Sequence, residues 1–203
     1  MPYEVVDNGK NNLLSIEDHD CLGTLTVVFS GNNNRVVIGR GSYFDAGYVE
    51  LNGECTFEAG DNNRFSRIHL YGLSRAEFLF GAGNGFTWDS FIAAHEPATI
   101  RFGDDCLVAS GCNFTASDMH SIIDISTGRR INPPANIVIG DHVWLGEGVR
   151  VLKGARIGSG SIIGAGSIVT SNKPVPENVI AVGSPVKVVK QAVTWNHALI
   201  DWI

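Results

Sequence analysis

Apolar residues recur every six positions between Ile139 and Ile168, and small or polar residues stand between them. Five consecutive six-residue words begin at Ile139, Leu145, Val151, Ile157 and Ile163. Each word opens with an aliphatic residue and has a small residue or Val at its fifth position, and four of the five have Gly second. A period of six does not fit the 3.6-residue repeat of an α-helix. It fits a short strand followed by a turn, and a repeat of this kind largely determines the fold.

The six-residue word has a simple physical interpretation. Its aliphatic first residue points inward from a short parallel strand, and its fifth residue is small because it also points inward, near a crowded corner. Glycine stands where the chain turns, since a Cβ would restrict φ there. Three words make one triangular coil of about 18 residues, and coils stack at the spacing of β-strands, roughly 4.8 Å. We therefore predict an all-β fold, a parallel β-helix of hexapeptide repeats.

Earlier parts of the chain follow the pattern more loosely. Good words begin at Ile38, Phe102 and Val108. Phenylalanine is frequent at the first position in the middle of the chain, whereas Ile, Val and Leu replace it later. This shift predicts a wider or less regular interior in the early coils and a tight prism in the late coils. Residues 62–77 and 93–101 break the count, and we expect them to bulge as corner loops.

The word pattern divides a single domain of residues 1–203 into five segments. We expect an irregular N-terminal cap over 1–35, early coils over 36–119, an extruded loop over 120–136, regular late coils over 137–185 and a short C-terminal helix over 186–203. The helix is predicted from apolar residues at helical spacing between Val188 and Leu199. It would cover the open last coil and block end-to-end strand pairing.

Composition and charge set limits on the function. Glycine makes up 24 of the 203 residues, which suits a fold built of corners. The formal net charge of −6 gives no support for nucleic-acid binding. The polar start of the chain and the lack of a long apolar run lead us to expect a cytoplasmic protein. Cys21, Cys55, Cys106 and Cys112 form no CxxC pair, so we expect core packing rather than metal or redox chemistry.

The words stop after Met119 and resume at Ile137. A long segment without repeats inside a compact domain is usually functional or disordered. This one carries four isoleucines, Ile122, Ile123, Ile125 and Ile131, so we expect it to pack against something. Because the flanking words are regular, the coil can resume after a loop that is extruded from it.

His120 stands where this loop leaves the regular prism. A general base that takes up a proton near neutral pH is most often a histidine, because the usual pKa of imidazole lies in that range. A surface histidine beside a loop is an equally good interpretation of its sequence position alone. His95, beside Glu96, is a second-choice site residue, and His142 lies at a corner-like position where we expect a solvated side chain.

The order of motifs resembles the hexapeptide-repeat acyltransferases over nearly the whole chain. The motifs are Ser-Asp-Met-His at 117–120, then the loop, Ile-Gly-Asp-His-Val-Trp-Leu-Gly at 139–146, Ile-Gly-Ala-Gly-Ser-Ile-Val-Thr at 163–170 and Ala-Val-Gly-Ser-Pro-Val-Lys-Val-Val at 181–189. The early Gly-Asn-Asn-Asn-Arg-Val-Val-Ile-Gly at 31–39 is similar to the opening of the branch that acetylates bacterial surface polysaccharides. The chain is most like the polysialic acid and capsular polysaccharide O-acetyltransferases.

This resemblance implies a left-handed β-helix, acetyl-CoA as acyl donor without a metal, and a homotrimer with sites between subunits. It makes His120 the general base of a direct transfer to a sugar hydroxyl and places Trp144 near it, although Trp144 could instead be a trimer-interface residue. Asp118 could orient the imidazole or cap a turn. Arg129 and Arg130 could meet an anionic acceptor, such as a sialic acid carboxylate, or form a solvated loop tip.

The resemblance also places the coenzyme along the glycine-rich late coils. Backbone amides there would pair with the pantetheine arm and stabilise an oxyanion, although corner geometry alone explains most of the glycines. Lys187 matches the basic residue near the coenzyme phosphates, while Lys173 is displaced by an unusual turn. The predicted coenzyme-binding residues are Gly146, Gly164, Ala165, Thr170, Lys173 and Lys187.

Three rival functions are compatible with parts of the sequence. The same fold could acetylate the amine of a nucleotide-linked amino sugar, but such relatives often have a nucleotide-binding domain in front, and the repeats here begin by about Val36. A metal-dependent hydratase of the carbonic anhydrase kind needs three imidazoles on one metal. His120 and His142 could pair for this purpose, but a third ligand is not evident. A catalytically silent scaffold would leave His120 unexplained.

Overall fold

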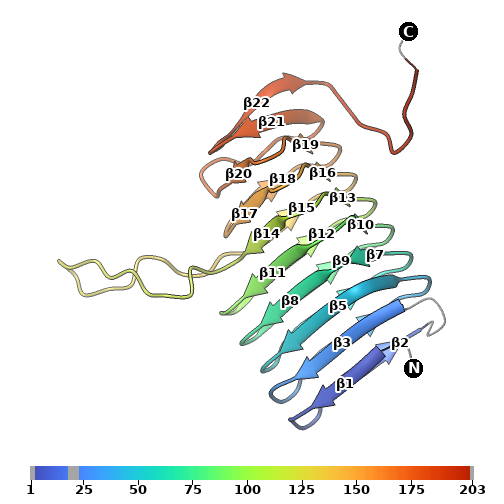
Figure 1. Ribbon diagram of the computed structural model, residues 1–203. Helices are drawn as coiled ribbons and strands as arrows, with labels where there is room; N and C mark the ends of the chain where they lie inside the picture. Colours follow the sequence, from blue (N-terminus) through green and yellow to red (C-terminus); the bar gives the residue numbers. More distant parts are fainter. Residues whose placement is uncertain (1–2, 18–22, 202–203) are drawn as a thin grey trace.

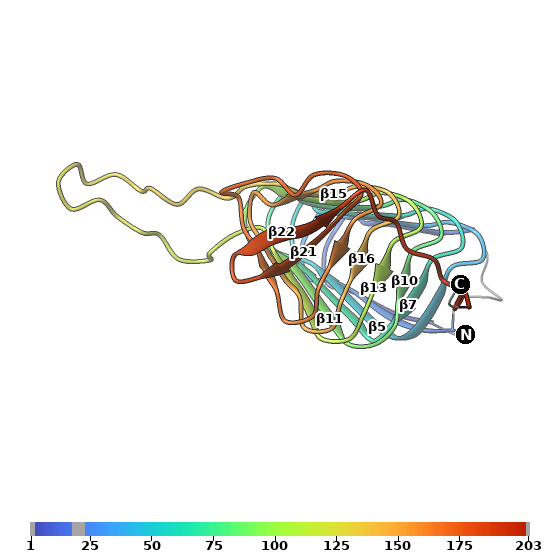
Figure 2. The ribbon, with the colours of Figure 1, turned by 90° about the horizontal axis from the view of Figure 1, so that it is seen from above.

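The chain forms a parallel β-helix in the computed structural model, which describes residues 3–17 and 23–201 (Figure 1). Through the middle of the prism, each turn of the chain adds a short strand to each of three faces. Seen from above, a long arm leaves the prism on one side and the C-terminal segment lies on the other (Figure 2). The described residues include no helix of the length and hydropathy that a membrane crossing requires.

Strand pairing defines the three faces. Face one contains β7 (Arg64–Ser66), β10 (Gly85–Phe86), β13 (Leu107–Val108), β16 (Trp144–Leu145), β19 (Ile162–Ile163) and β21 (Val179–Gly183). Face two contains β8 (Ile68–Gly72), β11 (Ser90–Ala94), β14 (Cys112–Thr115), β17 (Arg150–Leu152) and β20 (Ile168–Val169). Face three contains β2 (Leu13–Ile16), β4 (Arg35–Ile38), β6 (Thr56–Ala59), β9 (Ala76–Phe80), β12 (Ala98–Phe102), β15 (Ile137–Ile139) and β18 (Arg156–Ile157).

Faces one and two are joined at the bottom of the prism. The long strand β5 (Tyr43–Leu51) pairs with β7 through its first half and with β8 through its second. Below it, β3 (Gly23–Phe29) pairs with β5, and β1 (Tyr3–Asp7) pairs with β3. All of these pairings are parallel, so the predicted all-β parallel β-helix is confirmed. The regular coils nevertheless begin well before Val36, because β1, β2 and β3 already pair in register instead of forming an irregular cap.

The predicted C-terminal helix is wrong. Residues Val186–Gln191 form β22, an antiparallel strand on the edge of β21, and the described residues after it contain no helix. Valines at alternate positions favour an extended chain, because branching at Cβ suits a strand better than a helix. The hairpin still covers the last coil, and charged residues such as Lys187 and Lys190 mark its outer strand.

Coil length changes along the prism. Phe57 pairs with Phe78 and Phe78 pairs with Ile100, so an early coil takes 21 or 22 residues. Ile139 pairs with Ile157, so a late coil takes 18. The segments 62–77 and 93–101 therefore do not bulge as loops, contrary to our expectation. They contain β7, β8 and parts of β9, β11 and β12, and their extra residues lengthen the coils.

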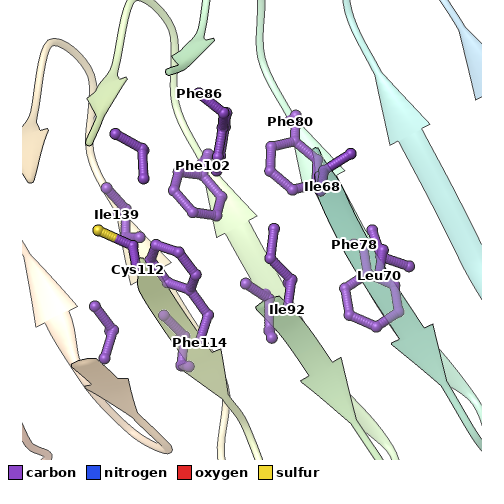
Figure 3. Packing of buried hydrophobic residues seen from close by; sticks show 14 of the residues in the cluster. Ile68, Leu70, Phe78, Phe80, Phe86, Ile92, Phe102, Cys112, Phe114 and Ile139 are labelled. Carbon is purple, nitrogen blue, oxygen red and sulfur yellow. The ribbon is translucent and has the colours of Figure 1, made fainter. Parts of the chain in front are cut away.

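Phenylalanines fill the early interior. The ring of Phe102 stacks on Phe80 at 4.8 Å and meets the edge of Phe114 at 5.1 Å (Figure 3). Phe65 stacks on Phe44 at 4.9 Å. Such contacts add to the free energy of burying the rings. Cys55, Cys106 and Cys112 are buried and unbridged, as expected for core packing, while Cys21 lies outside the described residues.

Buried asparagines form a ladder at the corner between faces three and one. Asn63 and Asn84 are each 1% exposed. The Asn63 carbonyl oxygen accepts a hydrogen bond from the Asn84 backbone N–H at 2.9 Å, and the Asn84 carbonyl oxygen accepts one from the Cys106 backbone N–H at 2.9 Å. The amides thus satisfy backbone groups that a longer coil leaves unpaired at its corner. In the late coils Val143 and Ser161 occupy this position.

Candidate active site

The most prominent surface feature is the extruded arm, residues 117–136, which leaves the coil between β14 and β15 (Figures 1 and 2). Its two halves run antiparallel, with a bridge between Ile123 and Arg130. The Asp124 carboxylate closes the tip by accepting hydrogen bonds from the Ser126 and Thr127 backbone N–H groups.

The apolar side chains of the arm are left uncovered by the rest of the described residues. Ile125 is 99% exposed, and Ile122, Ile123 and Ile131 are each at least 50% exposed. Our expectation that they pack against something is therefore not met inside one chain. A row of exposed isoleucines on a projecting arm is typical of a surface that meets another molecule.

The base of the arm is held by a network around Asn132, which is 7% exposed. Its amide nitrogen donates to Asp118 Oδ2 and to the His120 carbonyl oxygen, both at 2.8 Å. Its carbonyl oxygen accepts from the Ile122 backbone N–H at 2.7 Å and from Arg130 Nε at 3.1 Å. The backbone on both sides of His120 is thus fixed. We did not predict this role for Asn132, because its place before Pro133 and Pro134 in the sequence gives no sign of it.

Arg130 and Asp118 belong to the same network. Arg130 pairs with both carboxylate oxygens of Glu96, and the Ser117 hydroxyl donates to Glu96 Oε2. These hydrogen bonds from Arg130 and Ser117 lower the pKa of Glu96 to about 2. Asp118 accepts hydrogen bonds from Lys153 and Asn132, which lower its pKa. Asp118 therefore anchors the arm and does not contact the His120 ring.

His120 is exposed at the corner between faces two and three. Its backbone N–H donates to the Asp118 carbonyl oxygen at 2.7 Å, while its ring has no partner among the described residues. Ala93 pairs with Thr115, and this register places His95 opposite Ser117, one coil below the root of the arm. His95 Nδ1 is buried without a hydrogen-bond partner, and burial lowers the pKa of this histidine. Its ring packs on Tyr71 at 5.2 Å.

Trp144 lies on a different face from His120. It opens β16 on face one, is 39% exposed and is in register with Leu107 below and Ile162 above. Ile180 extends the same row. We call Leu107, Trp144, Ile162 and Ile180 the apolar row. Because the arm leaves at the corner between faces two and three, one chain does not bring His120 and Trp144 together.

The predicted coenzyme-binding residues fall into two groups. Gly146 and Ala165 stack at the corner between faces one and two, where a Cβ on Gly146 would lie 2.7 Å from Ala165 N. A Cβ on Gly164 would lie 2.6 Å from Val182 Cγ1, so both glycines are required by close stacking of the coils. Thr170 directly follows β20, at the corner that carries the arm lower down.

Lys173 and Lys187 come together at the top of the prism. Both line an open cavity of about 360 Å³ under β22, together with Pro174, Val175, Pro176, Val186 and Gln191. Proline and valine side chains give the cavity an apolar floor, and the two ammonium groups give it positive charge. Such a site suits a ligand that carries both an apolar part and phosphate groups.

His142 and Trp195 form a second aromatic site at the corner between faces three and one. Their rings stack at 4.2 Å with an angle of 5° between them. His142 Nδ1 lies 2.7 Å from Asp105 Oδ2, so the side chain is paired and not simply solvated as we expected. Asp105 and His142 both stand at the fourth position of their words, and this shared position is a sequence signal that could have indicated their contact.

Comparison with known proteins identifies relatives of the chain. Residues 136–171 match the family model "Bacterial transferase hexapeptide (six repeats)". A curated relative from Neisseria meningitidis, named polysialic acid O-acetyltransferase, is 30% identical over 145 residues. That alignment covers 69% of this chain and 65% of the relative, a little less than two thirds of its length.

Two solved structures resemble the whole prism. The polysialic acid O-acetyltransferase OatWY has a TM-score of 0.77 and 28% identity, over 97% of this chain and 92% of that one. The polySia-specific acetyltransferase NeuO has a TM-score of 0.67 and 30% identity, over 97% of this chain and 90% of that one.

Proposed function

Because this chain belongs to the bacterial hexapeptide-repeat transferases, we propose that it moves an acetyl group from acetyl-CoA to a hydroxyl of a bacterial surface polysaccharide. The observation that carries the proposal is His120, an exposed imidazole on an anchored backbone at the root of the extruded arm. Relatives named polysialic acid O-acetyltransferase favour polysialic acid as the acceptor, and a hydroxyl over an amine. A cytoplasmic location stays a prediction.

In the proposed reaction His120 takes the proton of the sugar hydroxyl while the hydroxyl oxygen attacks the thioester carbonyl carbon. The tetrahedral oxyanion then collapses, the carbon–sulfur bond breaks and the imidazolium returns the proton to the departing thiolate. No enzyme nucleophile is needed. The buried cysteines are unsuited to that role, since burial raises the pKa of Cys106 to about 12 and that of Cys112 to about 11.

A second copy of the chain completes the site in this proposal. The exposed isoleucines of the arm and the apolar row of face one are complementary apolar surfaces on different sides of the prism. If the arm of one copy lies on face one of the next, His120 of the first copy meets Trp144 of the second. Head-to-tail contacts form a ring when the rotation between neighbouring copies closes, and we propose a homotrimer closed in this way.

For the coenzyme we propose a path along the late coils. Lys173 and Lys187 would bind its phosphates in the cavity under β22. Exposed backbone near Gly146, Gly164 and Ala165, together with Thr170, would pair with the pantetheine amides. A backbone N–H along this path would stabilise the oxyanion, because fixed dipoles at developing charge are effective in catalysis.

For an anionic acceptor the structure favours Arg129 over Arg130. Arg130 is already paired with Glu96, whereas the Arg129 guanidinium has no partner among the described residues. We propose that Arg129 meets a carboxylate of the polymer and that Arg130 holds the arm in place. His95, whose ring packs on Tyr71 one coil below the root of the arm, would help to shape the acceptor site.

A thiol-release assay with acetyl-CoA tests the proposal. The acceptor panel contains polysialic acid, oligomers of other acidic sugars, neutral oligosaccharides and nucleotide-linked amino sugars. Release of coenzyme A only with acidic polysaccharides supports the proposal, and identification of an O-acetyl ester by NMR fixes the product. Turnover only with amino sugars would indicate N-acetylation. The absence of any turnover, with metal found in the purified protein, would favour the hydratase instead.

A further inference from the structure

The C-terminal tail, residues 192–201, runs back down the corner between faces three and one. The Val193 backbone N–H donates to the Asn178 carbonyl oxygen at 3.1 Å, Trp195 Nε1 donates to the His142 carbonyl oxygen at 2.8 Å, and His197 Nε2 lies 3.1 Å from Asp105 Oδ1. Alternate residues of the tail thus meet three levels of one corner, from Asn178 at the top to Asp105 at the bottom.

Backbone geometry explains why this corner accepts the tail. Asp105, His142 and Asn178 occupy the same position in their coils, and each has a positive φ, between 52° and 55°. Gly160, also with positive φ, lies between His142 and Asn178 and presents no side chain. The corner therefore leaves room above the His142 ring, and Trp195 fills it.

Trp195 is only 8% exposed although it lies near the end of the chain. Its indole stacks on the His142 ring, lies 6.1 Å from the Trp144 ring at an angle of 50°, and meets the His197 ring edge at 4.6 Å. Trp144 therefore has one side backed by Trp195, while it remains 39% exposed.

The His142 ring is fixed from both of its nitrogens. Nδ1 faces Asp105 Oδ2 at 2.7 Å and Nε2 faces the Trp195 carbonyl oxygen at 3.0 Å. Each ring nitrogen thus faces an oxygen atom, one of the Asp105 carboxylate and one of the Trp195 backbone, and the two contacts orient the ring. Trp195 is thus held by its ring, by its indole N–H and by its carbonyl oxygen.

We propose that Trp195 is a positioning residue, which fixes the Trp144 ring in the orientation that the acetyl-transfer site requires, and that Asp105 and His142 hold Trp195 in place. This inference rests on the proposed function. It assigns a role in the reaction to the tail, in which two large apolar residues do not pack on the prism: Leu199 is fully exposed at 103% and Ile200 is 71% exposed.

The test compares Trp195→Ala with Trp195→Phe and with Leu199→Ala, a matched change of a large tail residue that touches nothing. All variants are made in the full chain and checked for oligomeric state by light scattering. We expect Trp195→Ala to lower kcat/KM for the acceptor about tenfold or more, since small misplacements at a reacting centre are costly. Acetyl-CoA KM should stay unchanged, Trp195→Phe should recover most of the activity, and Leu199→Ala should match the unmodified chain.

Coupling to Trp144 separates positioning from general stability. In the Trp144→Ala background, Trp195→Ala should cause little further loss, because its effect passes through the missing ring. The near-ultraviolet circular dichroism of the tryptophan pair should disappear in either single variant. If Trp195→Ala does not fold, His142→Asn tests the same contact, since Asn tolerates positive φ.

Two results would overturn the inference. One is kcat and KM values for Trp195→Ala equal to those of Leu199→Ala. The other is a loss of activity on adding Trp195→Ala to the Trp144→Ala variant that is as large as the loss in the unmodified chain. Failure of the proposed function is distinguishable from both, because the unmodified chain would then show no transfer to any acceptor while the circular dichroism comparison would still report on the Trp144–Trp195 contact.

Discussion

The coils before the extruded arm differ from those after it in length and filling. Early coils of 21 or 22 residues enclose stacked phenylalanines and carry buried asparagines at a corner. Late coils of 18 residues enclose Ile, Val and Leu and turn through small residues. A larger perimeter needs larger side chains to fill it, because protein interiors tolerate few voids. The residues that we assign to the reaction lie almost entirely in the arm and the late coils.

This difference suggests that the early coils serve mainly stability and that the arm and the late coils serve the reaction. The phenylalanine stack stabilises the lower part of the prism, below the arm. The narrow late coils bring glycine corners, Trp144 and the lysine-lined cavity to the surface. Substitutions in the early coils should therefore lower the free energy of unfolding, whereas substitutions in the arm and the late coils should lower the rate of acetyl transfer.

The largest effect is expected at the arm. His120→Ala should lower kcat roughly 10²–10⁴-fold, because the general base is lost. Thermal unfolding and acetyl-CoA binding should stay close to those of the unmodified chain, since the exposed ring makes no contact that holds the fold. His69→Ala, an exposed histidine on face two of the early coils, is the matched control. Activity of His120→Ala within threefold of the control would remove His120 from the mechanism.

The next effect concerns the early interior. Phe102→Ala should lower the free energy of unfolding by about 3–5 kcal/mol, as is usual for a buried ring, because Phe102 touches Phe80, Phe86 and Phe114. Ile163→Val in a late coil should lower it by about 0.5–1.5 kcal/mol. Urea unfolding measures both. Activity per folded chain should be unchanged in Phe102→Ala, and a selective loss of kcat there would contradict the division between the regions.

A smaller, salt-dependent effect is expected at the top cavity. Lys187→Glu places a negative charge beside the proposed phosphate site, so the KM for acetyl-CoA should rise severalfold at low salt. The rise should fade at high salt, and the KM for the acceptor should not change. Lys190→Glu, on the same strand but outside the cavity lining, is the control. Equal KM values for acetyl-CoA in the two variants at low salt would exclude this site.

The smallest effect concerns the anchoring of the arm at acid pH. The pKa of Glu96 falls from its usual value of about 4.5 to about 2 in the folded chain. Because folding lowers this pKa, the ionised Glu96 carboxylate stabilises the anchored arm fully above about pH 4.5, and this stabilisation is lost as pH falls towards 2. Hydrogen exchange at the Ile122 and Ile131 amides should therefore be protected at pH 5 and lose protection towards pH 2.

Glu96→Gln should remove most of this acid dependence by loosening the arm at every pH. Glu77→Gln, a change at an exposed position on face three, should leave the acid dependence of protection intact. Identical protection profiles for Glu96→Gln and the unmodified chain would show that the Arg130 pair does not anchor the arm.

The sequence predicted the coils and the arm well, because a six-residue period and its interruption are local patterns. It failed at the C-terminus, where the valines of β22 satisfy both a helical spacing and a strand alternation. It also missed the contacts of Asn132 and Trp195. Trp195 meets a histidine 53 residues away, and such long-range contacts have no signature in a single sequence. The sequence also left the role of Trp144 open, because in a single chain Trp144 lies on a different face of the prism from the arm.

The most direct test of the account mixes two inactive variants. The central claim is that His120 of one chain works with Trp144 of another. His120→Ala and Trp144→Ala chains, each nearly inactive alone, are combined in equal amounts by unfolding and refolding, and thiol release is measured. A shared site in a trimer predicts recovery of about a quarter of wild-type activity, because three quarters of random trimers are mixed and each mixed trimer regains one site in three. Activity that stays at the level of the separate variants would contradict the claim.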